Sequence, residues 1–126
     1  MTTPLRCLLI VALLPYLLAW VGGYLKVRQF GRLDNKNPRQ QTARLEGVGA
    51  RIAAAQANAW EALGLFTAAI VVAHLGGQDP ARAAWLSQLF VATRLLHPVF
   101  YGLDLDKLRS LVFIVGLGCV IGLVRI

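Results

Sequence analysis

Four long apolar segments occupy most of this chain and limit the folds open to it. A membrane-spanning helix needs about 20 apolar residues, and the segments run from Leu8 to Tyr24, Ile52 to Leu75, Ala83 to Tyr101 and Leu108 to Val124. Hydrophobic residues make up 57% of the chain and charged residues only 15%, which does not suit a soluble domain of 126 residues. A soluble four-helix bundle would carry a polar stripe at helical period on each segment, and these segments show almost none. We therefore expect one all-α integral membrane domain over residues 1–126, a bundle of four transmembrane helices at about 5–25, 51–75, 81–102 and 107–124.

The first segment resembles a signal peptide in having Arg6 before an apolar run. No small-x-small cleavage site follows, and Tyr16, Trp20 and Tyr24 come instead. We expect a retained first helix, in which Pro15 produces a kink rather than a stop.

The net charge of +7 would suggest nucleic-acid binding in a soluble protein, but here its placement predicts topology instead of a nucleic-acid partner. Nine cations lie in or beside the first and third connections: Lys26, Arg28, Arg32, Lys36, Arg39, Arg44, Arg51, Lys107 and Arg109. Only Arg6, Arg82 and Arg125 lie on the other side. The positive-inside rule then places both termini outside and the first and third loops in the cytoplasm. Attraction to anionic lipid headgroups accounts for most of the remaining basic excess.

The connections differ in length. The first, from Leu25 to Ala50, is long and polar with a turn signal at Asn37 and Pro38, and we expect it to lie on the membrane surface. The second is short, with Asp79 suited to an N-cap and Pro80 to the first helical turn. The last segment carries Gly116, Gly118 and Gly122, which favour close helix packing.

Polar side chains inside the apolar segments are the candidate functional residues. Glu61 lies mid-segment, where an ionisable group costs about 2.5 to 3.5 kcal/mol on insertion scales. Arg51 and Asn58 fall in the same sector of that helix at 100° per residue. On the next segment, Arg94, His97 and Tyr101 share a face at i, i+3 and i+7, and Pro98 frees a helical carbonyl beside them.

Two interpretations of these polar faces are open. Glu61 and Arg94 could form a buried structural ion pair. However, one glutamate cannot neutralise Arg28, Arg51, Arg94 and Arg109, so an anionic ligand would supply the missing charge. A metal site is not expected, because the only histidine besides His97 is His74, near the other end of its helix, and Cys7 and Cys119 lack metal-ligand spacing.

These residues resemble the motifs of the MAPEG family, the membrane-associated proteins in eicosanoid and glutathione metabolism. The segment RIAAAQANAWEA is similar to its second-helix pattern E-R-x-x-R-A-H-x-N-x-x-E, matched here by Arg51, Asn58 and Glu61. RLLHPVFY matches R-x-x-H-x-x-x-Y through Arg94, His97 and Tyr101. The Arg-Ser pair that opens the fourth helix is Arg109 and Ser110, Arg28 resembles the arginine of helix one, and NKNPRQQ resembles the first loop of many bacterial members.

The resemblance implies a homotrimer in a membrane, expected to be the bacterial inner membrane, with glutathione as co-substrate between neighbouring subunits. Arginines and Tyr101 or His97 would hold its carboxylates and backbone, and Asn58 its amides. Glu61 would receive the ammonium group. Arg109 would stabilise the thiolate, with Ser110 as a second donor, because a free thiol with a pKa of about 8.5 is mostly protonated at neutral pH. The expected activity is that of a membrane-bound glutathione transferase or peroxidase acting on lipophilic electrophiles or lipid hydroperoxides from the bilayer.

The chain departs from the family pattern at four positions: Ala50 replaces the glutamate, Ala54 the second arginine, Gln56 the histidine, and Phe113 a tyrosine after the Arg-Ser pair. These losses favour an alternative, a non-catalytic member that binds a lipid or glutathione, which the retained Arg109 and Ser110 disfavour. A small multidrug transporter is a further alternative. Its membrane glutamate would lie in helix one, where this chain has no acid.

Overall fold

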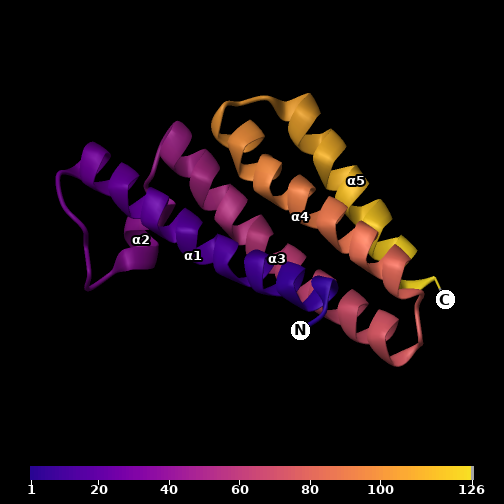
Figure 1. Cartoon of the computed structure of the whole chain (residues 1–126). Helices are drawn as coiled ribbons and strands as arrows, with labels where there is room; N and C mark the ends of the chain where they lie inside the picture. The colour runs from indigo at the N-terminus through magenta and orange to yellow at the C-terminus, as the bar shows by residue number, and fades with distance from the viewer. Residues whose placement is uncertain (126) are drawn as a thin grey trace.

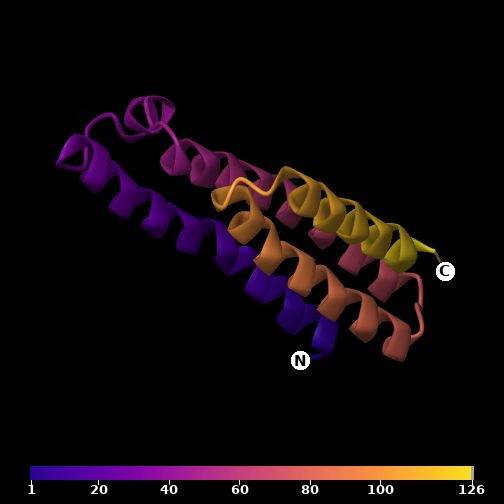
Figure 2. The same ribbon diagram turned by 90° about the horizontal axis from the view of Figure 1, so that it is seen from above.

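The computed structural model describes residues 1–125, and among these every regular element is helical. The five helices are α1 (Thr3–Phe30), α2 (Pro38–Ala43), α3 (Val48–Leu75), α4 (Pro80–Gly102) and α5 (Asp106–Val124). The four long helices lie side by side as an elongated bundle, and α2 lies beside the end of α1 and the start of α3 (Figures 1 and 2). The first helix ends at Phe30 rather than near residue 25, and the short α2 was not anticipated in the first connection.

Local sequence explains the helix ends. The Asp79 side chain accepts a hydrogen bond of 2.8 Å from the Arg82 backbone N–H, and Pro80 begins α4, as predicted. Gly31 ends α1 with a positive φ of 81°, which glycine adopts at no steric cost, and its N–H donates to the Val27 carbonyl. The helix continues through Pro15, so that proline is not a stop.

Two apolar clusters hold the bundle together. The larger one includes Val11, Phe66, Phe90 and Leu123, with the two phenylalanine rings stacked at 4.2 Å between centroids. The smaller one joins Leu14 and Leu18 of α1 to Ala55 and Ala59 of α3, with Tyr101 against it. Small alanines on α3 let α1 approach closely, so the bundle is packed throughout its length.

Three described helices, α1, α3 and α5, are long and apolar enough to cross a membrane. With 23 residues α4 is long enough to cross, but its polar residues keep it out of the set of helices that are apolar enough. Several of them, Ser87, Thr93, Arg94 and His97, are buried against the other helices. Four long helices are therefore present, while a fourth membrane crossing stays a prediction.

Two of the three glycines of α5 are approached by α4. A Cβ atom on Gly116 would lie 3.0 Å from Thr93 Oγ1, and one on Gly122 would lie 3.0 Å from a Leu86 methyl. A Cβ on Gly118 would meet nothing within 4 Å of this chain. Within one chain, close packing therefore depends on Gly116 and Gly122 rather than on the Gly118–Gly122 pair.

Replacing Gly116 by leucine should force α4 and α5 apart, since Thr93 and the Phe90 ring occupy the space that the new side chain needs. We expect Gly116→Leu to lower the free energy of unfolding by about 1–3 kcal/mol. Gly118→Leu is the matched control and should not lower it, because a Cβ there meets no atom of the described residues within 4 Å and leucine is a better helix former than glycine. Denaturation of both variants in one detergent tests this; equal stabilities would contradict the packing described.

Candidate functional site

A cavity of about 460 Å³ opens between α3, α4 and α5 near the α4–α5 connection. We call it the polar cavity, and its wall is formed by Ala54, Ala57, Asn58, Glu61, His97, Tyr101, Arg109, Ser110, Phe113 and Ile114. Six of these, Asn58, Glu61, His97, Tyr101, Arg109 and Ser110, are candidate residues from the sequence. Small-molecule sites in proteins commonly have volumes of about 300–1,000 Å³, so the polar cavity has the size of a ligand site.

Helical periodicity explains why these side chains meet. Residues 54, 57, 58 and 61 follow at i, i+3, i+4 and i+7 on α3, which places them on one face. On α4, His97 and Tyr101 are one turn apart, and α4 continues as a helix through Pro98. The first turns of α5 supply Arg109 and Ser110, so three helices contribute to one site.

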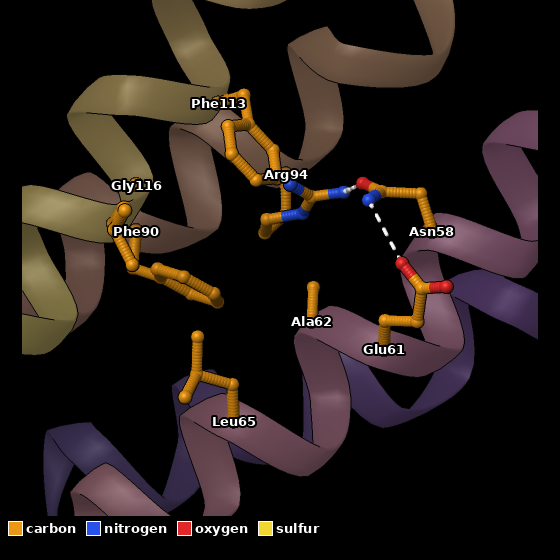
Figure 3. A pocket seen from close by; sticks show the side chains of 9 residues that line it. Asn58, Glu61, Ala62, Leu65, Phe90, Arg94, Phe113 and Gly116 are labelled. Carbon is orange, nitrogen blue, oxygen red and sulfur yellow. Dashed lines mark hydrogen bonds between the residues drawn. The ribbon is translucent and has the colours of Figure 1, made fainter.

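A smaller cavity of about 140 Å³, the inner cavity, adjoins the polar cavity and shares Asn58, Glu61 and Phe113 with it. Arg94 also lines it, and its side chain is only 3% exposed. Arg94 Nη2 donates a hydrogen bond of 2.6 Å to Asn58 Oδ1, and Asn58 Nδ2 donates one of 3.4 Å to Glu61 Oε2 (Figure 3). Asn58 thus connects the buried guanidinium to the exposed carboxylate.

This arrangement differs from a buried ion pair between Glu61 and Arg94. The asparagine lies between the two charges, and Glu61 is exposed rather than enclosed with the arginine. Arg94 Nε and His97 Nδ1 are buried and have no hydrogen-bond partner among the described residues. Since buried polar atoms are nearly always hydrogen-bonded, these two atoms are exceptions, and both residues line a cavity wall.

An aromatic stack positions Arg109. Its guanidinium carbon lies 4.5 Å from the centroid of the Tyr101 ring, within cation–π range. The Tyr101 ring in turn packs edge-on against His97, with 5.7 Å between centroids. The charge at the start of α5 is therefore supported by two side chains of α4, and it faces the polar cavity.

Two candidate arginines lie elsewhere in the single chain. Arg51 donates from Nε and Nη2 to the Gly102 carbonyl, both at 3.2 Å, and so caps the end of α4. Arg28 is exposed on α1, where its Nη1 donates to the Tyr24 hydroxyl at 3.3 Å. The structure does not bring either arginine into the polar cavity.

Sequence reasoning missed the apolar part of both walls. Ala57 and Ile114 line the polar cavity, and Leu65, Phe90 and Leu117 line the inner one. These are common residues of membrane helices, and no sequence signal separates them from other apolar positions. By contrast, Ala54 and Phe113, which depart from the family motif, do line the polar cavity.

The sequence of this chain matches one known protein family. The sequence model of the MAPEG family matches residues 3–126, nearly the whole chain. The chain belongs to the MAPEG family. No curated protein and no solved structure matches it significantly. Family membership, together with three helices able to cross a membrane, makes this an integral membrane protein of a family that acts in eicosanoid and glutathione metabolism.

The described residues contain no group of three or more His, Cys, Asp or Glu side chains that could hold a metal ion. Cys7 and Cys119 are buried free thiols within the apolar core.

Replacing Asn58 by leucine should leave the Arg94 guanidinium buried without its 2.6 Å acceptor. Because a hydrogen bond to a charged group contributes about 1.5–3 kcal/mol, we expect the free energy of unfolding to fall by that amount. Gln56→Leu, which removes an amide two residues away on the same helix, is the control. Denaturation in a single detergent compares the two, and an equal loss in both variants would contradict the role assigned to Asn58.

Proposed function

We propose that this MAPEG protein is a membrane-bound glutathione transferase or peroxidase. The observation that carries the proposal is the convergence of Arg109, Ser110, His97, Tyr101, Asn58 and Glu61 on one cavity. The cavity wall offers a cation (Arg109), a hydroxyl donor (Ser110) and a single carboxylate (Glu61). These groups match a peptide thiol that is zwitterionic with a net negative charge. The family to which the chain belongs supports glutathione as that peptide.

The geometry supports a separate role for each end of the ligand. Exposed Glu61 is available for the ammonium group of glutathione, because it is held only by a 3.4 Å bond from Asn58. The unpartnered Arg94 Nε and His97 Nδ1 favour a carboxylate or peptide carbonyl deeper in the site. Arg109 then faces the thiol, and Ser110 donates a second hydrogen bond to sulfur.

Arg109 would lower the pKa of the thiol by stabilising the thiolate. Each pKa unit corresponds to about 1.4 kcal/mol of stabilisation of the thiolate relative to the thiol. In the transferase reaction, the thiolate sulfur forms a bond to carbon of a lipophilic electrophile, whose leaving group departs with the bonding electrons. In the peroxidase reaction, sulfur attacks the distal oxygen of a lipid hydroperoxide, and a second glutathione completes reduction to alcohol, water and disulfide. Exposed Phe113 and Ile114 at the cavity wall suit a second substrate that arrives from the bilayer.

A homotrimer completes this proposal. Glu61, Ser110, Phe113 and Ile114 line the cavity and are all exposed in the single chain, so a neighbouring copy has room to close it. A neighbour could also contribute Arg28, which the single chain holds away from the cavity. The proposal includes four membrane crossings, with α4 crossing beside the other helices and its polar side chains turned inward.

The proposed location is the bacterial inner membrane. Charge placement supports a topology with both termini external and the first and third loops in the cytoplasm. The polar cavity lies near the third loop, between α4 and α5, and would therefore open toward the cytoplasm, where glutathione is available.

A non-catalytic member that binds a lipid or glutathione is a second candidate. It is favoured by the two apolar residues, Ala54 and Phe113, that line the polar cavity where the family motif has polar groups. Both candidates predict binding at the same cavity. Only the enzyme requires Arg109 to stabilise a thiolate.

The ultraviolet difference spectrum of bound glutathione separates the two candidates. We expect a thiolate band with the parent protein and its loss in Arg109→Ala, because no other cation lines the polar cavity within the described residues. Lys107→Ala, which removes an exposed cation of the same helix, should retain the band. If the parent protein shows no thiolate band, the result would contradict the enzyme and support the non-catalytic binder.

Glu61→Gln tests the ammonium contact. Since a hydrogen bond to a charged group contributes about 1.5–3 kcal/mol, we expect glutathione affinity to fall roughly 10- to 150-fold. Calorimetric titration measures the affinity, and native mass spectrometry should show the same oligomer in both proteins. Gln56→Leu serves as the control, and equal affinity in Glu61→Gln and the parent would remove the proposed role of Glu61.

A further inference from the structure

A third cavity lies at the end of α1 and shares no lining residue with the polar cavity or the inner cavity. It has a volume of about 500 Å³ and is formed between the last third of α1 and the connection that follows. We call it the loop groove; its main residues are Trp20, Gly23, Tyr24, Lys26, Leu33 and Pro38. None of these is a candidate residue of the glutathione site.

The connection is folded back against α1 by specific contacts. Lys26 Nζ donates to the Pro38 carbonyl at 3.1 Å, and Leu33 packs over Gly23. The amide of Gln41, which is 3% exposed, accepts from the Asp34 N–H and donates to the Arg32 carbonyl, at 3.0 and 2.9 Å. These contacts make the loop groove a built feature, and Figure 1 shows the connection returning beside α1.

The groove spans the boundary between lipid tails and headgroups. At about 1.5 Å per residue, the 28 residues of α1 extend about 42 Å, which exceeds the roughly 30 Å of a hydrocarbon core. Trp20 and Tyr24 are exposed by 76% and 60%, and such aromatic residues gather at the membrane interface. Leu33 is also exposed by 56%, so the loop presents an apolar side chain at the same level.

The charged residues that line the groove are Lys26 and Asp34, and the net charge of the connection that forms it favours an anionic ligand. The connection from residue 25 to 50 carries six cations, Lys26, Arg28, Arg32, Lys36, Arg39 and Arg44, against Asp34 and Glu46, a net charge of +4. Asp34 also lines the groove, but its Oδ1 accepts from the backbone N–H groups of Lys36 and Asn37. Lys26 has one acceptor, Pro38, and an ammonium has three donors, so it has donors left for a phosphate.

From this combination we infer that the loop groove binds an anionic phospholipid of the surrounding bilayer. Lys26 holds the headgroup phosphate, and the net positive charge of the connection attracts it. Trp20, Tyr24 and Leu33 contact the glycerol region and the first carbons of an acyl chain. The site is independent of the glutathione reaction, and a bound lipid would stabilise the loop against α1.

The test uses tryptophan quenching in the full-length protein, reconstituted after Trp60→Phe and Trp85→Phe so that Trp20 is the only tryptophan. Vesicles contain brominated phosphatidylglycerol or brominated phosphatidylcholine at equal mole fraction in an unlabelled phosphatidylcholine background. We expect brominated phosphatidylglycerol to quench Trp20 more strongly than brominated phosphatidylcholine. This preference for phosphatidylglycerol should fall as the salt concentration rises, because exposed charges are screened. Added inorganic phosphate at millimolar concentration should leave the preference unchanged, which distinguishes a lipid site from a free-phosphate site.

The matched variants are Lys26→Gln, Lys26→Arg and Lys107→Gln. Each cation near an anionic membrane contributes roughly a fivefold preference, so Lys26→Gln should lower the preference for phosphatidylglycerol by about that factor. Lys26→Arg and Lys107→Gln should retain it. Equal quenching by both lipids, a salt-independent preference, or an equal loss in Lys107→Gln would overturn the inference. Absence of quenching by either lipid would overturn it too, because another protein copy would then cover the groove.

Discussion

A guanidinium buried among three membrane helices is the constraint on which the rest of the site depends. Arg94 cannot leave its charge unsupported in an apolar bundle, and its 2.6 Å bond to Asn58 fixes how α3 and α4 lie relative to each other. Asn58 can then reach Glu61 with its other amide atom. Gly116 of α5 lines the inner cavity beside this group, and its lack of a side chain lets Thr93 and Phe90 of α4 pack closely against α5.

The same constraint explains the composition of α4. Its polar residues Ser87, Thr93, Arg94 and His97 are buried, whereas Trp85, Leu95 and Val99 are exposed. The neighbouring helices cover these buried polar groups, while the outer surface of α4 is largely apolar apart from the exposed Arg82 and Gln88. Its polar residues therefore lower the mean hydropathy of α4 although several of them face the other helices.

The sequence predicted the parts of this protein that depend on local rules. The long apolar segments, the Asp79 cap and the shared faces of α3 and α4 follow from periodicity and capping chemistry. The folding of the first connection against α1 could not be predicted, because it depends on the tertiary contacts of Lys26 and Gln41. The role of Asn58 was also out of reach, since spacing places it beside Glu61 but gives no distance to Arg94. Apolar wall residues such as Phe90 carry no signal of their own.

The position of Arg51 shows that residues of one sequence motif need not perform one task. Asn58 and Glu61 line the polar cavity, whereas both donors of Arg51 reach the Gly102 carbonyl at the end of α4. Directly after that carbonyl the chain turns through Asp104, which has a positive φ of 61°, and enters α5. The turn determines where α5 begins and therefore the position from which Arg109 faces the cavity. Tyr101, one residue before Gly102, lies against the Arg109 guanidinium, with 4.5 Å between the guanidinium carbon and the ring centroid. By holding this corner against α3, Arg51 acts on the geometry of Arg109 without lining the cavity, so a loss of function on its substitution would be expected even if it never touched the ligand.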